Sequence, residues 1–158
     1  MQPTTDDLIA GIAKGTLQSK LGAYRLLLIR DGHNSKAVTA MENKLATEPT
    51  PGIFKIVKNL DQDSGPYLDW PTILRRRLSE CKSVDGRYDT IGSEFDYGPD
   101  AVEVLSKTAL KDEDDETRAW AMLTLARQSE ETLDPLIHDV AMQYLCLLYT
   151  SPSPRDRG

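Results

Sequence analysis

The chain of 158 residues has the length of a single domain or a short array of repeats. Hydrophobic residues make up 39% of it and charged residues 28%, which is too apolar for a disordered chain. The 25 Asp and Glu residues outnumber the 19 Lys and Arg residues, so the net charge is −6, which argues against nonspecific nucleic-acid binding. The sequence contains neither a run of about 20 apolar residues nor the pattern of a secretory signal. We therefore expect a soluble, cytoplasmic protein with a modest core.

Three helices are predicted in the first third of the chain. Thr4 and Asp7 have the spacing of a capping box and open a short first helix. Leucine and tyrosine residues that recur every three or four positions from Leu17 to Leu28 predict the second helix. Ser35 is the predicted N-cap of the third. The short links between them imply that consecutive helices lie side by side and antiparallel.

The middle of the chain is predicted to hold two more helices and an irregular stretch. Thr50, followed by proline, predicts the start of a helix that runs to about Leu60. Asp69 predicts the start of the next helix, whose pattern fades near Cys81. The helical period is lost between residues 82 and 99, where we expect an irregular insertion, either a loop or a small hairpin.

The last third is predicted to contain three helices. The first starts at Asp100, and the second follows the acidic turn over residues 112–115 and buries Ala119, Trp120 and Leu123 among others. The third has the clearest amphipathic stripe of the chain, from Leu133 to Tyr144. Eight helices and no convincing strand predict an all-α fold.

One segment, from Leu110 to Ala126, resembles a HEAT repeat of the bacterial, phycobilisome-lyase-like kind. Thr117 stands where that family has Val, and Ala126 where it has Gly. The resemblance implies structural roles: the turn aspartates and the helix arginine bridge neighbouring repeats, and the central alanine permits close helix approach. The residues that carry it are Asp112, Asp114, Arg118, Ala121 and Leu125, together with Leu110.

The resemblance extends over residues 100–141 and, more weakly, over residues 5–48. In the weaker segment Lys20 takes the place of the arginine and Ala23 that of the central alanine. A period near ~40 residues would allow three such units. The resemblance implies a right-handed α-solenoid fragment of HEAT-like helix pairs, interrupted by the irregular insertion near residues 82–99.

The C-terminal residues differ in composition from the helix before them. Residues 146–156 resemble the translation of a transposase sequencing adapter. We therefore expect residues 1–145 to be a HEAT-like domain truncated at its C-terminus, and residues 146–158 to be an artefactual, disordered tail, although one further helical turn over residues 147–149 is possible. Without the tail, Cys81 is the single cysteine, which fits a reducing compartment. Truncation would expose an apolar flank through which the chain can self-associate.

Few residues favour catalysis or metal binding. His33 and His138 have no second histidine at metal-ligand spacing, and no nucleophile or phosphate-binding motif occurs. Asp61 and Asp63 begin like a calcium loop, but position twelve is Thr72 instead of a glutamate. We predict no catalytic, cofactor-binding or metal-binding residue.

Two groups of residues are candidates for binding a partner. Aromatic residues gather around the irregular middle, either as core or as a surface patch. Arginines at positions 75–77 form the only dense basic cluster, although three consecutive helical residues cannot all face one groove. The candidate residues are Tyr67, Trp70, Arg75, Arg76, Tyr88, Phe95 and Tyr97.

The favoured interpretation is a non-enzymatic scaffold that binds a protein partner of unknown identity. One alternative, implied by the resemblance, is an enzyme-associated HEAT-like protein of the bilin lyase type that acts on a bilin-carrying protein. Another is nucleic-acid binding through Arg75, Arg76 and Arg77, which the negative net charge disfavours. No cofactor and no membrane association are expected.

Overall fold

The computed structural model describes residues 1–91, 97–98, 100–128 and 134–150, which form α-helices and no strand. The prediction of an all-α fold is confirmed. None of the described helices is long and apolar enough to cross a membrane. The helices are α1 (Thr5–Ala13), α2 (Leu17–Asp31), α3 (Ser35–Thr47), α4 (Ile53–Ser64), α5 (Trp70–Glu80), α6 (Val84–Ile91), α7 (Ala101–Lys111), α8 (Asp115–Arg127) and α9 (Asp134–Thr150).

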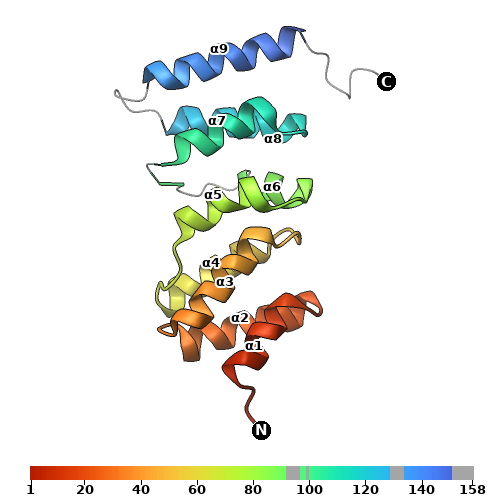
Figure 1. The fold of residues 1–158 in the computed structure, drawn as a ribbon, viewed down its shortest axis with the longest axis vertical. Helices are drawn as coiled ribbons and strands as arrows, with labels where there is room; N and C mark the ends of the chain where they lie inside the picture. The colour runs from red at the N-terminus through yellow and green to blue at the C-terminus, as the bar shows by residue number, and fades with distance from the viewer. Residues whose placement is uncertain (92–96, 99, 129–133, 151–158) are drawn as a thin grey trace.

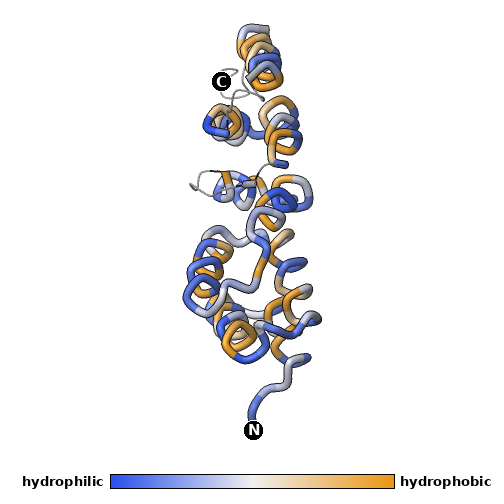
Figure 2. Tube along the Cα trace, turned by 90° about the vertical axis from the view of Figure 1, so that its left-hand side faces the viewer, coloured by the Kyte–Doolittle hydropathy of each residue, from blue (hydrophilic) through white to orange (hydrophobic). Residues whose placement is uncertain are grey.

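Consecutive helices alternate between two layers, with the described ends of the chain at opposite ends of the array (Figures 1 and 2). In one layer each odd-numbered helix packs on the next one, from α1 through α3, α5 and α7 to α9. In the other layer α2 packs on α4 and α6 packs on α8, whereas no comparable backbone approach joins α4 to α6. The even-numbered layer therefore has a seam between α4 and α6.

The repeat length is shorter than the expected ~40 residues. The odd-numbered helices start at intervals of 30 to 35 residues. This spacing follows from helices of three to four turns joined by short links. Four successive helix pairs therefore precede α9, instead of the expected three units.

A helix occupies part of the segment in which an irregular insertion was expected. The alternatives of a loop or a hairpin are wrong for α6, which spans Val84–Ile91 and is the reason that nine helices are described instead of eight. Its inward positions are Gly86, Arg87, Thr90 and Ile91, of which only the last is apolar. Polar side chains can be buried when their hydrogen bonds are satisfied, and such positions give no apolar period in the sequence. The sequence pattern therefore did not predict this helix.

The predicted helix starts are partly confirmed. Thr4 and Asp7 form the capping box, in which each backbone N–H donates to the other residue's side chain at 3.0 and 3.1 Å. Asp69 caps α5, as predicted. Asn34, not Ser35, caps α3 by accepting a hydrogen bond from the third backbone amide of that turn.

The predicted helix start at Thr50 is wrong, since α4 begins only at Ile53. The residue before it, Gly52, has a φ of 85°, in the left-handed region that favours glycine. Its N–H donates to Asp89 Oδ2 of α6 at 2.8 Å. A contact from a distant helix thus takes the place of the predicted local cap.

The buried face of α8 differs from the predicted one. Thr117, Ala121, Thr124 and Leu125 are buried, whereas Leu123 is exposed. Two of the four buried residues are threonines, so the prediction from apolar residues alone placed the buried face on the wrong side of the helix. Ala121 and Leu125, which carry the resemblance to the HEAT repeat, lie on the buried face.

Residues 146–150 continue α9, which ends at Thr150. The expected disorder of the tail therefore does not hold for this segment, in which Leu147, Leu148 and Tyr149 have no helix-breaking neighbour. The rest of the tail, residues 151–158, lies outside the described residues.

Truncating Ile137 should test the packing of α9 on the preceding helices. Ile137 is 7% exposed on a helix that packs on α7 and α8. We expect Ile137→Ala to lower the free energy of unfolding by about 2 kcal/mol, at the low end for such truncations, because α9 has described neighbours on one side only. The control is Leu136→Ala, whose side chain is 52% exposed. Equal losses in urea denaturation of the two variants would contradict the packing of Ile137.

Candidate functional site

The candidate aromatic residues mostly belong to the packed interior. Trp70 and Tyr97 are buried, at 6% and 0% exposure, while Tyr67 and Tyr88 are half-buried. The ring of Tyr67 packs edge-on against His33 at 4.9 Å between centroids. Phe95 lies outside the described residues. The described aromatic residues therefore do not form one exposed patch.

Asp61 is a buried carboxylate at the C-terminal end of α4. It accepts hydrogen bonds from the backbone N–H groups of Tyr67 at 2.8 Å and Leu68 at 3.2 Å, and from the indole Nε1 of Trp70 at 2.7 Å. This carboxylate therefore fixes the link between α4 and α5 and has its hydrogen-bonding capacity engaged. Within the described residues no cluster of metal-ligating side chains is found.

The arginines at positions 75–77 point to different partners. Arg75 donates to the Tyr97 carbonyl at 2.6 Å, and Arg76 forms a bidentate ion pair with Glu80. Arg77 is fully buried. The three guanidinium groups therefore do not form a free basic patch, and the hypothesis of nucleic-acid binding through them loses its support.

Arg77 joins three segments of the chain. Its guanidinium donates to the carbonyls of Leu45 at 2.6 Å and Glu48 at 3.1 Å, which end α3, and to the Gly86 carbonyl of α6 at 3.1 Å. Its Nε donates to the Thr90 hydroxyl at 2.7 Å. Burial lowers the pKa of the Arg77 guanidinium from its ordinary value, and nearby acidic groups partly oppose this shift.

An open groove of about 250 Å³ lies where α5 and α6 meet α7 and the turn that precedes α8. Its walls combine apolar side chains from α5 and α7 with charged side chains of both signs. The lining residues are Leu78, Ser79, Arg87, Val104, Lys107, Thr108, Lys111, Asp112 and Glu113.

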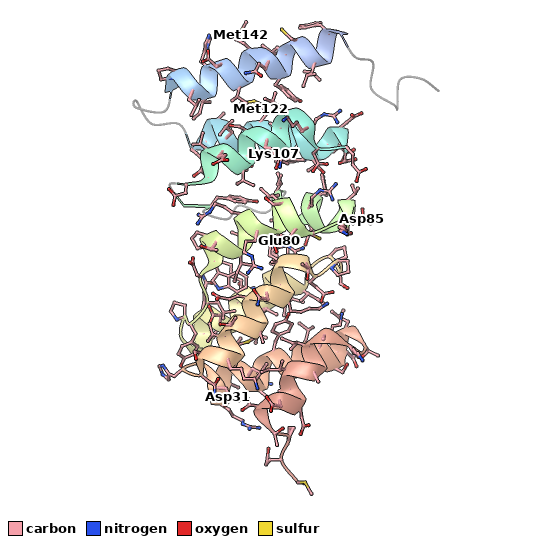
Figure 3. All side chains as sticks on the ribbon, in the orientation of Figure 1. Asp31, Glu80, Asp85, Lys107, Met122 and Met142 are labelled. Atoms are coloured by element: carbon pink, nitrogen blue, oxygen red, sulfur yellow. The ribbon has the colours of Figure 1, made fainter. Side chains whose placement is uncertain are left out.

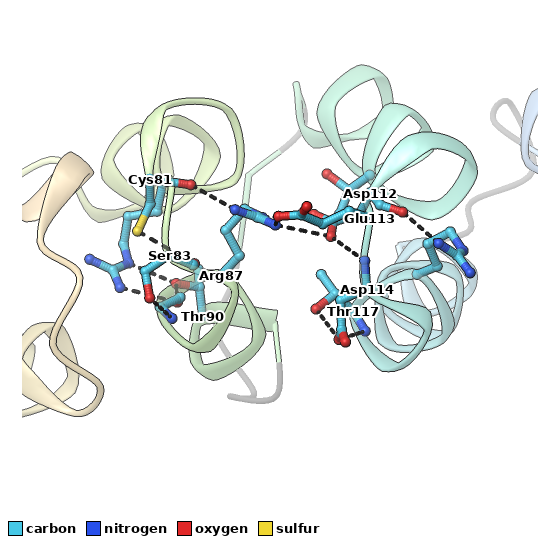
Figure 4. A network of polar contacts seen from close by, with 12 residues as sticks. Cys81, Ser83, Arg87, Thr90, Asp112, Glu113, Asp114 and Thr117 are labelled. Atoms are coloured by element: carbon cyan, nitrogen blue, oxygen red, sulfur yellow. Dashed lines mark hydrogen bonds and ion pairs between the residues drawn. The ribbon is translucent and has the colours of Figure 1, made fainter. Parts of the chain in front are cut away.

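An ion pair between α6 and the turn that precedes α8 lines the groove (Figure 4). Arg87 of α6 donates to both carboxylate oxygens of Asp112, at 2.8 and 3.2 Å, and to Glu113 at 3.1 Å. Its Nη1 also donates to the Cys81 carbonyl at 3.0 Å. The hydrogen bonds to Asp112 raise the pKa of the Arg87 guanidinium. The Arg87 charge is thus engaged within the protein.

The residues that carry the HEAT resemblance divide into two roles. Asp112 bridges helix pairs, but its partner is Arg87 instead of the helix arginine that the resemblance implies. Arg118 stays within its own turn, where it donates to the Asp112 carbonyl at 2.6 Å and pairs with Asp115. Asp114 caps α8 through the N–H and hydroxyl of Thr117. Sequence reasoning missed Arg87 because it lies in a segment without an apolar period.

Two lysines of α7 that line the groove have no partner among the residues that the structure describes. Lys107, labelled in Figure 3, and Lys111 are one turn apart on α7 and are both exposed. Neither forms an ion pair or a hydrogen bond with any residue that the structure describes. They are the cations of the groove that a ligand can reach without breaking an internal ion pair.

The outer face of α9 is apolar and exposed. Met142 lies on the side of the helix that is turned away from α7 in Figure 3. The exposed apolar residues of α9 are Leu136, Met142, Leu145, Leu147, Leu148 and Tyr149. Met142, Leu145 and Tyr149 recur at spacings of three and four, so they share one face of α9, and an exposed apolar face favours association between proteins.

We expect Met142→Glu combined with Leu145→Glu to reduce self-association of the purified chain. Both side chains are more than two-fifths exposed, so charges are tolerated there but oppose burial of this face against a second copy. The control combines Ile29→Glu with Ile56→Glu, two exposed positions on α2 and α4. Sedimentation velocity should show the first variant shifted toward monomer and the control unchanged. A wild-type chain that is monomeric at the same concentrations would contradict this prediction.

Comparison of the chain with protein-family models, with curated protein sequences and with solved structures gives no match. The groove, its charges and the arrangement of the helices are therefore the basis for a functional proposal.

Proposed function

We propose that the chain is a non-enzymatic, HEAT-like helical scaffold, a fragment of a right-handed α-solenoid, that binds a partner protein in the groove between α5, α6 and α7. The single observation that carries the proposal is this groove, which combines apolar walls with accessible, unpaired lysines. Interfaces between proteins typically combine an apolar centre with a polar rim.

The two-layer arrangement supports a scaffold function. Helices that pack chiefly on their neighbours form an elongated surface, which repeat proteins use for binding. Cys81 forms no disulfide with any described residue, which is typical of proteins of the reducing cytoplasm and supports a cytoplasmic scaffold.

Photo-crosslinking from the groove tests the proposal. A benzophenone amino acid at Ser79, an exposed residue of the groove, should yield a crosslinked product of discrete mass in an extract of the organism that encodes the chain. The same group at Lys55, exposed on α4, is the control. A colourless protein captured from Ser79 alone supports the scaffold, and a coloured, bilin-carrying protein would favour the lyase-type alternative. Equal labelling from both positions, or none, would contradict the proposal.

A further inference from the structure

We propose that the groove binds an acidic segment of its partner protein, with carboxylates on Lys107 and Lys111 and an aliphatic side chain between Leu78 and Val104. This inference rests on the proposed function and adds the chemistry of the ligand. The charges of the described groove residues carry it.

Of the three cationic side chains that line the groove, Lys107 and Lys111 are available to a ligand and Arg87 is not. The Arg87 charge is engaged by Asp112, whose side chain is 5% exposed, and by Glu113. A ligand carboxylate that approached Arg87 would have to displace these partners and leave a buried acid uncompensated. Lys107 and Lys111 have no such partner among the described residues, so an ion pair with them breaks no internal contact.

The spacing of the two lysines selects a ligand with two carboxylates. Residues four apart on a helix have side chains on the same face, about 6 Å apart at the Cβ atoms. Acidic side chains on the same side of an extended segment have a similar separation, since alternate residues of a strand are about 6.6 Å apart. The positions between and directly beside the acidic pair face the other way along such a strand, so the aliphatic contact comes from a residue two positions before or after the pair.

The apolar walls favour a protein segment over a nucleic acid. Leu78 is buried and Val104 is half-buried, and both line the groove next to the lysines. An aliphatic side chain gains from such a contact, whereas a phosphate backbone does not. A polyanion such as RNA meets more repulsion from Asp112, Glu113 and the net charge of −6 than a short segment with two carboxylates, because it carries more negative charges. A short acidic segment with aliphatic residues fits both the charge and the walls.

The experiment measures fluorescence anisotropy of a labelled peptide that contains Glu and Leu, with a second peptide in which Gln replaces Glu. Lys107→Gln combined with Lys111→Gln should weaken binding of the Glu peptide about tenfold at low salt, or ~1.4 kcal/mol. The matched control combines Lys14→Gln with Lys55→Gln, which removes the same charge from exposed positions directly after α1 and on α4. It should change the affinity by less than about twofold.

Three results would overturn the proposal. The first is equal affinity for the Glu and Gln peptides. The second is an equal loss of affinity for the Glu peptide in both double variants. The third is displacement of the labelled Glu peptide by a single-stranded RNA at a lower concentration than by the unlabelled Glu peptide. Circular dichroism and urea denaturation confirm that each variant is folded. Crosslinking from Ser79 to a partner, together with no preference for the Glu peptide, would retain the scaffold and reject the acidic ligand. Failure of both experiments would reject the proposed function itself.

Discussion

Replacing Arg77 with methionine should lower the free energy of unfolding by about 4 kcal/mol. Methionine has a similar length and fills the space, but it cannot donate the hydrogen bonds that Arg77 makes to the C-terminal end of α3 and to α6. The variant would leave the Leu45 carbonyl without its side-chain donor in the interior, whereas the Gly86 carbonyl keeps the Thr90 hydroxyl and the Glu48 carbonyl keeps the Cys81 thiol. A buried group that is left unsatisfied costs about 1 to 3 kcal/mol. It would also lose the contact of the guanidinium with the Phe54 ring, at 4.4 Å from the centroid.

The matched control is the neighbouring substitution Arg76→Met. Arg76 pairs with Glu80 and bonds to Asn43 at the surface, where ion pairs contribute about 0 to 1 kcal/mol. Urea denaturation with an unchanged slope should place the two variants about 3 kcal/mol apart. A loss of less than about 1 kcal/mol for Arg77→Met would contradict the view that its hydrogen bonds hold the segments together.

Removing the buried carboxylate at the end of α4 should have the second largest effect. Asp61→Ala takes the acceptor from two backbone N–H groups in the link between α4 and α5 and from the indole of Trp70 at the start of α5. We expect a loss of about 3 kcal/mol in the free energy of unfolding, because hydrogen bonds to a charged acceptor contribute about 1.5 to 3 kcal/mol each and relaxation recovers part of them.

The control for this substitution is Asp63→Ala, two residues further on, where the side chain is exposed. It should change stability by less than about 0.5 kcal/mol. The indole of Trp70 supplies a second readout, since its fluorescence should change in Asp61→Ala and not in the control. Equal stability of the two variants would show that water replaces the carboxylate without cost.

The sequence predicted helices well where burial is apolar. The capping box at Thr4 matches the structure, and the predicted stripe on α9 matches it at Ile137 and Val140, which are buried. Leu136 of that stripe is exposed, and Leu133 lies outside the described residues. The same rules overlooked α6 and chose the wrong face of α8, because Arg87, Thr90, Thr117 and other buried polar groups break the apolar period. Thr90 and Arg87 are held by Arg77 and Asp112, which lie 13 and 25 residues away in the sequence, and no local pattern reveals such contacts.

The candidate site was predicted less well than the fold. Trp70 and Tyr97 were candidates for a binding patch, yet both are buried and hydrogen-bonded within the chain. Lys107 and Lys111 attracted no attention because two lysines on a helix are ordinary in sequence. Their significance comes from the groove beside them, which exists only when α5 and α7 are packed together.

We expect the seam between α4 and α6 to divide the molecule into two cooperative units. Across the seam, Gly52 before α4 donates to Asp89 of α6, Arg77 of α5 contacts Phe54 of α4 and bonds to the end of α3, and α3 packs on α5. In repeat arrays, stability is approximately a sum of local terms and nearest-neighbour interfaces. Amide hydrogen exchange should therefore show α1 to α4 and α5 to α9 opening with different free energies, each unit protected as a block.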